Sequence, residues 1–267
     1  MALPVKWHQW VLDNLMRGVS ASTLLPILLE NGFAFEQCRR VLGRHLPESE
    51  RHLKDAVFYR KLAEAPLRAG NVGLEALESE KAQLFRIQQF LSADECQHLM
   101  RLTEHKLRPS ELASTTSDRY FRTSSTGDLE NYDDPFIGEL NQRIAQTLGL
   151  DHSYGEPIQA QRYLQGQQFK AHTDYFEPAT DEYAHHAKQR GQRSWTLMIY
   201  LNQDCGGGET EFPRLSLSVV PLQGMALLWN NLDADGVVNG NTLHHAHPVS
   251  DGRKYVITKW FRDQAYE

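Results

Sequence analysis

The second half of this 267-residue chain consists of short apolar runs separated by clusters of glycine and proline. We expect strands at 159–164, 196–201, 217–220, 225–229 and 254–261. Many short strands at such spacing, with turn-forming residues between them, are typical of a β-sandwich or a jelly roll. The sequence therefore predicts a mainly β domain after residue 156.

The first third of the chain has helical periodicity instead. Ser22 can cap a helix that ends before Gly32, and further helical segments are expected at 50–64 and 71–82. We therefore predict a small helical module over residues 1–80. This module either supports the main domain by packing against it or binds a partner or substrate.

Several elements join the module to the strands. A strand is predicted at 84–87, and the spacing of Ser92 and Glu95 fits a capping box at the start of a helix. A second helix is expected at 135–148. The polar segment 177–192 is either a mobile lid beside a site or a long solvated loop.

Composition narrows the classes of partner and compartment. The formal net charge of −6 argues against duplex nucleic acid as the main partner, because phosphate binding requires a basic surface. Three widely spaced cysteines, Cys38, Cys96 and Cys205, form neither a disulfide framework nor a CxxC zinc motif. We find no signal-peptide pattern and no apolar run of about 18 residues, the length that spans a membrane. We therefore expect a cytoplasmic protein without a membrane partner, and the sequence does not specify an oligomeric state.

A histidine and a carboxylate, His172 and Asp174, stand two residues apart in the stretch FKAHTDYF. On an extended chain the two side chains point to the same side and can bind one metal ion, but they need a third ligand. His244, His245 and His247 in LHHAHPVSDGRKY are candidates, of which at most one is needed. Two histidines and a carboxylate suit Fe(II) in oxygenases, although zinc accepts the same ligand types.

The last predicted strand begins with a lysine on an otherwise apolar face. Alternation places Lys254, Val256, Thr258 and Trp260 on one side of it. A buried ammonium group without a counter-ion costs several kcal/mol, on the order of its desolvation. Lys254 therefore either extends to solvent at the strand end or meets a carboxylate, such as the far carboxylate of 2-oxoglutarate.

An ordered set of motifs after residue 80 resembles the prolyl 4-hydroxylase branch of the Fe(II)/2-oxoglutarate dioxygenases. The single H-x-D pair is a weak signal, whereas the whole set in this order is specific. The motifs are E-x-x-Q-x-x-x-Y from Glu156 to Tyr163, H-x-D at His172 and Asp174, Arg193-Ser-Trp-Thr196, G-G-E-T-x-F-P from Gly207 to Pro213, LLWNNLDADG, and H-x-x-x-P-V-x-x-G-x-K from His244 to Lys254, followed by Trp260.

The resemblance implies a double-stranded β-helix with flanking helices over residues 81–267. It implies His172, Asp174 and His244 as the catalytic metal ligands, and it selects His244 because this residue stands four positions before Pro248. By the same resemblance, Tyr163 and Lys254 bind 2-oxoglutarate, and Glu156, Arg193 and Trp260 line the substrate side. The apolar residues Trp260, Val256 and Leu197 are expected to exclude water. Phe169 stands where the family often has a tyrosine near the proline.

The activity implied by the resemblance is the hydroxylation of an unactivated C–H bond, on a prolyl residue of a peptide or protein. Fe(II) is the cofactor, 2-oxoglutarate and O2 are cosubstrates, and ascorbate is a reductant. The alternatives are the same chemistry on a small molecule or free amino acid, a cupin-like metal enzyme without 2-oxoglutarate, and a non-catalytic binding module that uses the barrel and the helical N-terminus. The negative net charge disfavours a nucleic-acid demethylase of the same superfamily, and so does Lys254, because those enzymes usually have an arginine at this position.

Overall fold

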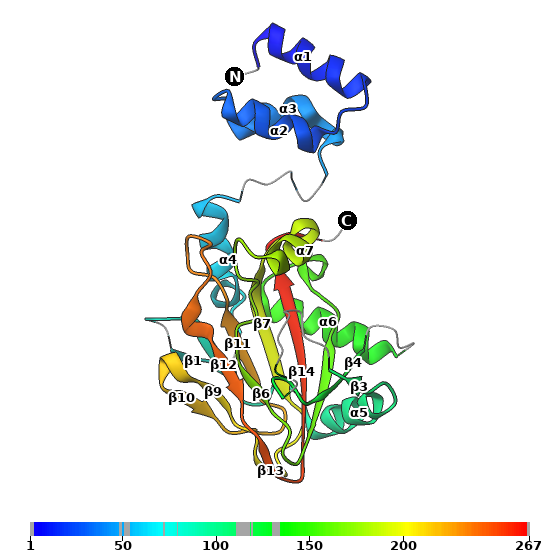
Figure 1. The fold of residues 1–267 in the computed structure, drawn as a ribbon, viewed down its shortest axis with the longest axis vertical. Helices are drawn as coiled ribbons and strands as arrows, with labels where there is room; N and C mark the ends of the chain where they lie inside the picture. Colours follow the sequence, from blue (N-terminus) through cyan, green and yellow to red (C-terminus); the bar gives the residue numbers. More distant parts are fainter. Residues whose placement is uncertain are drawn as a thin grey trace.

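The fold is built around two antiparallel sheets that face each other and enclose a core (Figure 1). The computed structural model describes residues 3–47, 50, 54–71, 73–78, 80–110, 118, 120–129 and 134–265. The larger sheet contains, in spatial order, β1 (Leu74–Glu78), β2 (Leu84–Ile87), β11 (Ala226–Asn230), β7 (Arg193–Tyr200), β14 (Arg253–Arg262), β5 (Gln159–Leu164), β4 (Ser125–Asp128) and β3 (Arg108–Pro109). The smaller sheet contains β10 (Leu217–Val219), β9 (Thr210–Phe212), β12 (His244–Ala246) and β6 (Phe169–His172).

A short third pair, β13 (Val249–Asp251) with β8 (Gly206–Gly207), closes one end of the barrel. This arrangement confirms the predicted double-stranded β-helix. The predicted strands are present, β2 and β5 with the predicted ends and the others with shifted ends; for example, β7 begins at Arg193 rather than at Thr196. Short 3-10 helices lie in several connections, for example at Gly43–His45, His152–Tyr154, Pro213–Leu215 and Gly240–Thr242.

Three helices cover the outer face of the larger sheet (Figure 1). They are α4 (Ala56–Arg68), α5 (Ala93–Glu104) and α6 (Pro135–Leu148). Leu62, Leu99 and Leu140 of these helices are buried against the sheet. The capping box predicted for α5 is confirmed, because the Ser92 hydroxyl accepts from the Glu95 N–H at 3.2 Å and the Glu95 carboxylate accepts from the Ser92 N–H at 2.8 Å.

Strand alternation separates two cores on either side of the larger sheet. The β14 residues that line the space between the sheets are Lys254, Val256, Thr258 and Trp260, as predicted. Ile257 and Phe261 join the helix-covered core instead. Leu197 of β7 also lies in that outer core, so its predicted place beside the site is wrong; its neighbour Met198 faces the site.

The N-terminal helices form a cluster with a core of its own. α1 (Val5–Met16), α2 (Ala21–Glu30) and α3 (Phe35–Leu42) bury Val11, Leu28 and Cys38 among themselves. Figure 1 places this cluster apart from the sheets, while α4 and β1 lie with the main body. The domain boundary at residue 80 stays a prediction. Within the described ranges, no helix has both the length and the apolar content that a bilayer crossing requires.

The helix predicted at 71–82 is wrong, because Leu74–Glu78 is the edge strand β1. The sequence LEALE favours a helix locally, but its antiparallel pairing with β2 overrides that propensity. Ser20, not Ser22, caps α2, because the Ser20 hydroxyl accepts from the Thr23 N–H. 

The predicted helix 50–64 is displaced to α4, which begins after Asp55 and continues through Pro66. Proline cannot donate to the carbonyl four residues earlier, at Leu62. That carbonyl instead accepts from the Trp195 indole N–H at 3.0 Å, so a sheet residue compensates for the proline.

The polar segment 177–192 contains a helix, α7 (Asp181–Arg190), that neither sequence interpretation included. The Thr180 hydroxyl caps it by accepting from the Tyr183 N–H. Phe176 stacks on His186 of this helix with ring centroids 5.1 Å apart. The interpretation as a long solvated loop is therefore wrong, and the mobile lid stays a prediction.

Candidate active site

Two strands of the smaller sheet bring the H-x-D pair and one distant histidine together. His244 of β12 is paired directly with His172 of β6. The Nε2 atoms of His172 and His244 each lie 4.0 Å from Oδ1 of Asp174. All three side chains are buried or nearly so. The structure thus brings together the three predicted ligands, and His245 and His247 lie outside this cluster.

Backbone carbonyls fix the protons of both imidazole rings. Nδ1 of His172 lies 2.8 Å from the carbonyl oxygen of Lys170, and Nδ1 of His244 lies 3.0 Å from that of Thr242. A carbonyl only accepts, so each Nδ1 carries the hydrogen and each Nε2 presents a lone pair. Burial lowers the pKa of His172 well below its usual value, with the His244 ring acting in the same direction.

The carboxylate of Asp174 is held by a residue of β7, which is supported in turn by the residue that follows β11. Its Oδ2 accepts from the Thr196 hydroxyl at 2.8 Å, and Thr196 in turn accepts from the Asn231 amide at 2.9 Å. Oδ1 therefore faces the two imidazole lone pairs. Three acceptor atoms that converge without a hydrogen between them fit a bound divalent cation, and the donor set of two imidazoles and one carboxylate suits Fe(II).

A small cavity leads from this triad to Lys254. It has a volume of about 30 Å³, and Tyr163, Met198 and Thr210 line it together with all three triad residues. The cavity is thus narrow, and it shares Phe169, His172, Asp174 and Trp260 with a second cavity on the other side of the triad.

Lys254 is fully buried at the far side of this cavity. Its Nζ donates to the carbonyl of Gly208 at 2.6 Å, and it lies over the rings of Tyr163 and Tyr200. An ammonium group has three donors, and in the described part of the chain no carboxylate lies within ion-pair distance of this one. The lysine thus does not reach solvent at the strand end.

Gly208 makes this approach possible. Its φ is 72°, a conformation that favours glycine, and an added Cβ would lie 3.1 Å from Cδ of Lys254. The turn predicted at Gly207 and Gly208 is displaced by one residue, because Gly207 belongs to β8 and the connection to β9 consists of Gly208 and Glu209. Tyr163, the other predicted 2-oxoglutarate ligand, donates its hydroxyl hydrogen to Gln161 at 2.7 Å.

A larger cavity of about 500 Å³ opens on the other side of the triad. His172, Asp174, Phe169 and Trp260 line both cavities. Phe169 stacks on the His172 ring with centroids 3.5 Å apart. The three residues predicted on the substrate side, Glu156, Arg193 and Trp260, all line this larger cavity.

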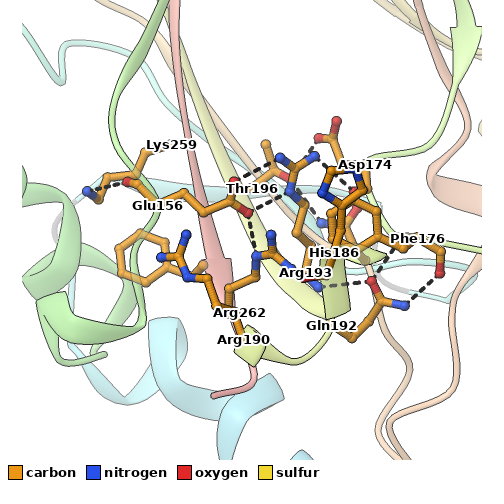
Figure 2. A network of polar contacts seen from close by, with 12 residues as sticks. Glu156, Asp174, Phe176, His186, Arg190, Gln192, Arg193, Thr196, Lys259 and Arg262 are labelled. Carbon is orange, nitrogen blue, oxygen red and sulfur yellow. Dashed lines mark hydrogen bonds and ion pairs between the residues drawn. The ribbon is translucent and has the colours of Figure 1, made fainter. Parts of the chain in front are cut away.

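Glu156 and Arg193 also belong to a buried ion-pair network (Figure 2). The Glu156 carboxylate accepts from Arg193 at 2.7 and 2.9 Å and from Arg262 at 2.6 Å. Burial alone raises the pKa of Glu156, but the two arginines outweigh it and hold the pKa at about 2. The guanidinium of Arg193 lies 4.1 Å from the Trp260 ring centroid, so this network fixes the wall of the cavity.

We expect Glu156→Gln to destabilise the protein by roughly 3–5 kcal/mol, because it leaves two buried arginines without their counter-ion. The pKa of Glu156 lies below its ordinary value, so its contribution is complete above pH 4.5 and is lost as the pH falls toward 2. Urea unfolding of the variant at neutral and acidic pH measures both effects. Glu177→Gln, at an exposed position on the cavity rim, is the control, and equal stability of the two variants would contradict the expectation.

Sequence reasoning missed several residues that form the site. Arg122 lines the larger cavity, with its guanidinium 4.7 Å from the Phe169 ring centroid. Arg262 supports Glu156, and Thr196 supports Asp174. Alternation along β7 puts Thr196 and Leu197 on opposite faces but does not say which face lines the site, and no local pattern marks Arg122.

A double-stranded β-helix with a two-histidine, one-carboxylate centre between its sheets defines an oxygenase domain of the Fe(II)/2-oxoglutarate class. The sequence model of the 2OG-Fe(II) oxygenase superfamily matches residues 158–262. The chain is 32% identical over 216 residues to prolyl 4-hydroxylase 2 of Arabidopsis thaliana, covering 71% of this chain and 70% of that protein. The chain belongs to the prolyl 4-hydroxylase family.

Other relatives match a smaller share of their own length. The prolyl 4-hydroxylase subunit alpha-1 of Homo sapiens is 31% identical over 194 residues, and the chain spans 36% of its length. Among solved structures, the viral collagen prolyl hydroxylase of Paramecium bursaria Chlorella virus-1 in its 2-oxoglutarate complex has a TM-score of 0.52 at 25% identity. The match covers 66% of this chain and 94% of that one. A Trichoplax adhaerens prolyl hydroxylase has the same fold, with a TM-score of 0.51 at 17% identity and coverage of 78% and 91%.

Proposed function

We propose that this chain uses Fe(II) and 2-oxoglutarate to hydroxylate a prolyl residue in a peptide or protein. The observation that carries this proposal is the position of the triad between two cavities, one ending at the buried Lys254 and one open for a larger molecule. Membership of the prolyl 4-hydroxylase family supports proline as the target.

His172, Asp174 and His244 would hold the iron, which when bound supplies the oxidative chemistry on O2 and 2-oxoglutarate. The protein's own residues bind and orient. Lys254 offers a charged donor to the far carboxylate of 2-oxoglutarate, and the Tyr163 hydroxyl lies in the same cavity. The aromatic rings of Phe169, Trp229 and Trp260 exclude water from the reacting atoms.

We expect the KM for 2-oxoglutarate to rise as the pH passes about 8. Burial lowers the pKa of Lys254 to about 8, so below this pH the free protein already carries the ammonium that pairs with the carboxylate. Above it, binding must take up a proton, and the KM rises up to about tenfold per pH unit. Steady-state assays from pH 6.5 to 9.5 measure this. A flat profile in the wild type would show that Lys254 is not the partner of the cosubstrate.

The larger cavity has features suited to a peptide. The buried indole N–H of Trp260 donates to no acceptor in the parts of the chain that the structure describes. Buried donors are normally paired, and a peptide carbonyl would pair this one. Aromatic walls also suit the pyrrolidine ring of proline.

Trp260→Phe keeps the aromatic face and removes the N–H group. We expect it to raise the KM for a proline peptide about two- to tenfold, the value of one hydrogen bond, and to leave the KM for 2-oxoglutarate unchanged. Initial rates with each substrate varied in turn separate the two constants. A variant with a normal peptide KM would remove Trp260 from the substrate contacts.

The proposed substrate class is tested with a library of proline-containing peptides, each matched with a copy in which alanine replaces proline. The expected result is 2-oxoglutarate-dependent addition of one oxygen atom to the prolyl residue, seen by mass spectrometry, in the proline copy alone. Turnover with free amino acids but with no peptide would reject the proposal. Ascorbate as reductant, a cytoplasmic location, and the absence of nucleic-acid and membrane partners stay predictions from the sequence.

A further inference from the structure

A second group of metal-ligating side chains lies on the opposite side of the strand that carries His244. It consists of Glu211, His245 and His247, whose ligand atoms all lie within 4.8 Å of one another. Residues alternate along a strand, so His245 points away from the barrel interior that His244 faces. Within the described residues, this group and the triad are the two clusters of this kind.

The strand pairing builds this second group. His245 of β12 is the direct partner of Glu211 of β9 in the antiparallel register. His247 follows two positions later, and its backbone N–H still bonds to the carbonyl of Glu209 at 2.9 Å. Two histidines on one side of a strand and a carboxylate on its neighbour therefore converge on the same spot.

The side chains already contact one another. Nε2 of His247 lies 2.7 Å from Oε2 of Glu211, and the rings of His245 and His247 have centroids 4.3 Å apart. Among the described residues, the hydrogen bond of the His245 ring is a long one, with its Nε2 3.4 Å from Oε1 of Gln168. A single histidine–glutamate hydrogen bond would account for two of these residues, but it gives no reason for the second imidazole beside them.

We propose that Glu211, His245 and His247 bind a divalent transition-metal ion, with Zn²⁺ the ion that suits two imidazoles and a carboxylate. Metal–ligand bonds of about 2.0–2.1 Å in a tetrahedron hold ligand atoms ~3.3 Å apart. The distance between Nε2 of His247 and Oε2 of Glu211 therefore increases slightly when the ion binds, and a water molecule is the fourth ligand. His247 and Glu211 are 36% and 38% exposed, so an ion reaches them from solvent.

The ion would join β9 to β12 on the outer side of the smaller sheet. Because β12 also carries His244, a bound ion braces the strand that holds one triad ligand. The role we infer is structural, since Glu211, His245 and His247 line neither of the two cavities beside the triad. The inference does not depend on the proposed hydroxylation.

The experiment first removes a ligand of the triad, so that metal binding is measured at the second group alone. Full-length His172→Ala protein is dialysed against Zn²⁺, and the bound metal is measured by elemental analysis. We expect one ion per chain in this variant, none after adding His247→Ala, and one after adding His185→Ala at an exposed position on α7. Co²⁺ in place of Zn²⁺ should give the intense visible absorption of a tetrahedral site in the same variants.

Thermal unfolding supplies a second readout. Zn²⁺ should raise the melting temperature of His172→Ala, and Glu211→Gln or His247→Ala in that background should abolish the rise. Circular dichroism without metal confirms that each variant is folded. The proposal is overturned if His172→Ala binds no ion, or if the ion remains after the loss of His247 or Glu211. Failure of the hydroxylation proposal alone would leave this result unchanged.

Discussion

Asp174→Ala is expected to abolish the conversion of 2-oxoglutarate to succinate. Asp174 supplies the oxygen toward which the Nε2 atoms of His172 and His244 converge, each at 4.0 Å. Changing a group that only orients a metal ligand costs about 10–100-fold in metal affinity or activity, so loss of the ligand itself should cost more. His172→Ala should have the same effect. Succinate release in the presence of saturating Fe(II) is the measurement.

Two matched variants make this expectation specific. Thr196→Val removes the hydroxyl that donates to Asp174 and should lower activity by about 10–100-fold while the ligands remain. His185→Ala changes an exposed histidine on α7 and should leave activity intact. Normal succinate production by Asp174→Ala would remove the triad from the mechanism.

Lys254→Met is expected to raise the KM for 2-oxoglutarate roughly thirty-fold to several-thousand-fold. Loss of a buried, charge-assisted contact typically costs about 2–5 kcal/mol, and each 1.4 kcal/mol is about tenfold. Methionine keeps the length and the apolar stem, and it removes a buried charge whose only hydrogen bond in the described structure goes to the Gly208 carbonyl. The fold should therefore not be weakened, and replacing buried charges with apolar groups is often neutral or stabilising.

Arg253→Met is the matched control for Lys254→Met. Arg253 is the neighbouring residue on β14, but its side chain is exposed. Titrating 2-oxoglutarate against both variants at fixed peptide concentration compares loss of a charge inside the cavity with loss of one outside. Similar KM values for Lys254→Met and the wild type would refute the assigned role of Lys254.

The sequence predicted the site best where strand alternation applied. β14 is a continuous strand of the larger sheet, so its period of two correctly placed Lys254 and Trp260 on the inner face. The same rule could not place Leu197, because the predicted strand carried no information about which face of β7 the helices cover. The choice of His244 among three nearby histidines came from the family resemblance, and the strand pairing with His172 now supports it.

Errors arose where distant parts of the chain decide local structure. The segment LEALE became an edge strand because β2 offers its hydrogen bonds, and α4 continues through Pro66 because Trp195 pairs with the carbonyl that the proline leaves open. Arg262 and Glu156 are more than a hundred residues apart, so no local pattern predicts their ion pair. The sequence did not predict the cluster at His245 and His247, since its third member lies on another strand.

A crystal of the protein soaked anaerobically with Mn²⁺ and 2-oxoglutarate tests the central claim most directly. We predict one metal ion bound by Nε2 of His172, Oδ1 of Asp174 and Nε2 of His244, and the far carboxylate of 2-oxoglutarate paired with Nζ of Lys254. A metal ion absent from this triad, or a 2-oxoglutarate molecule whose far carboxylate lies away from Lys254, would contradict the account.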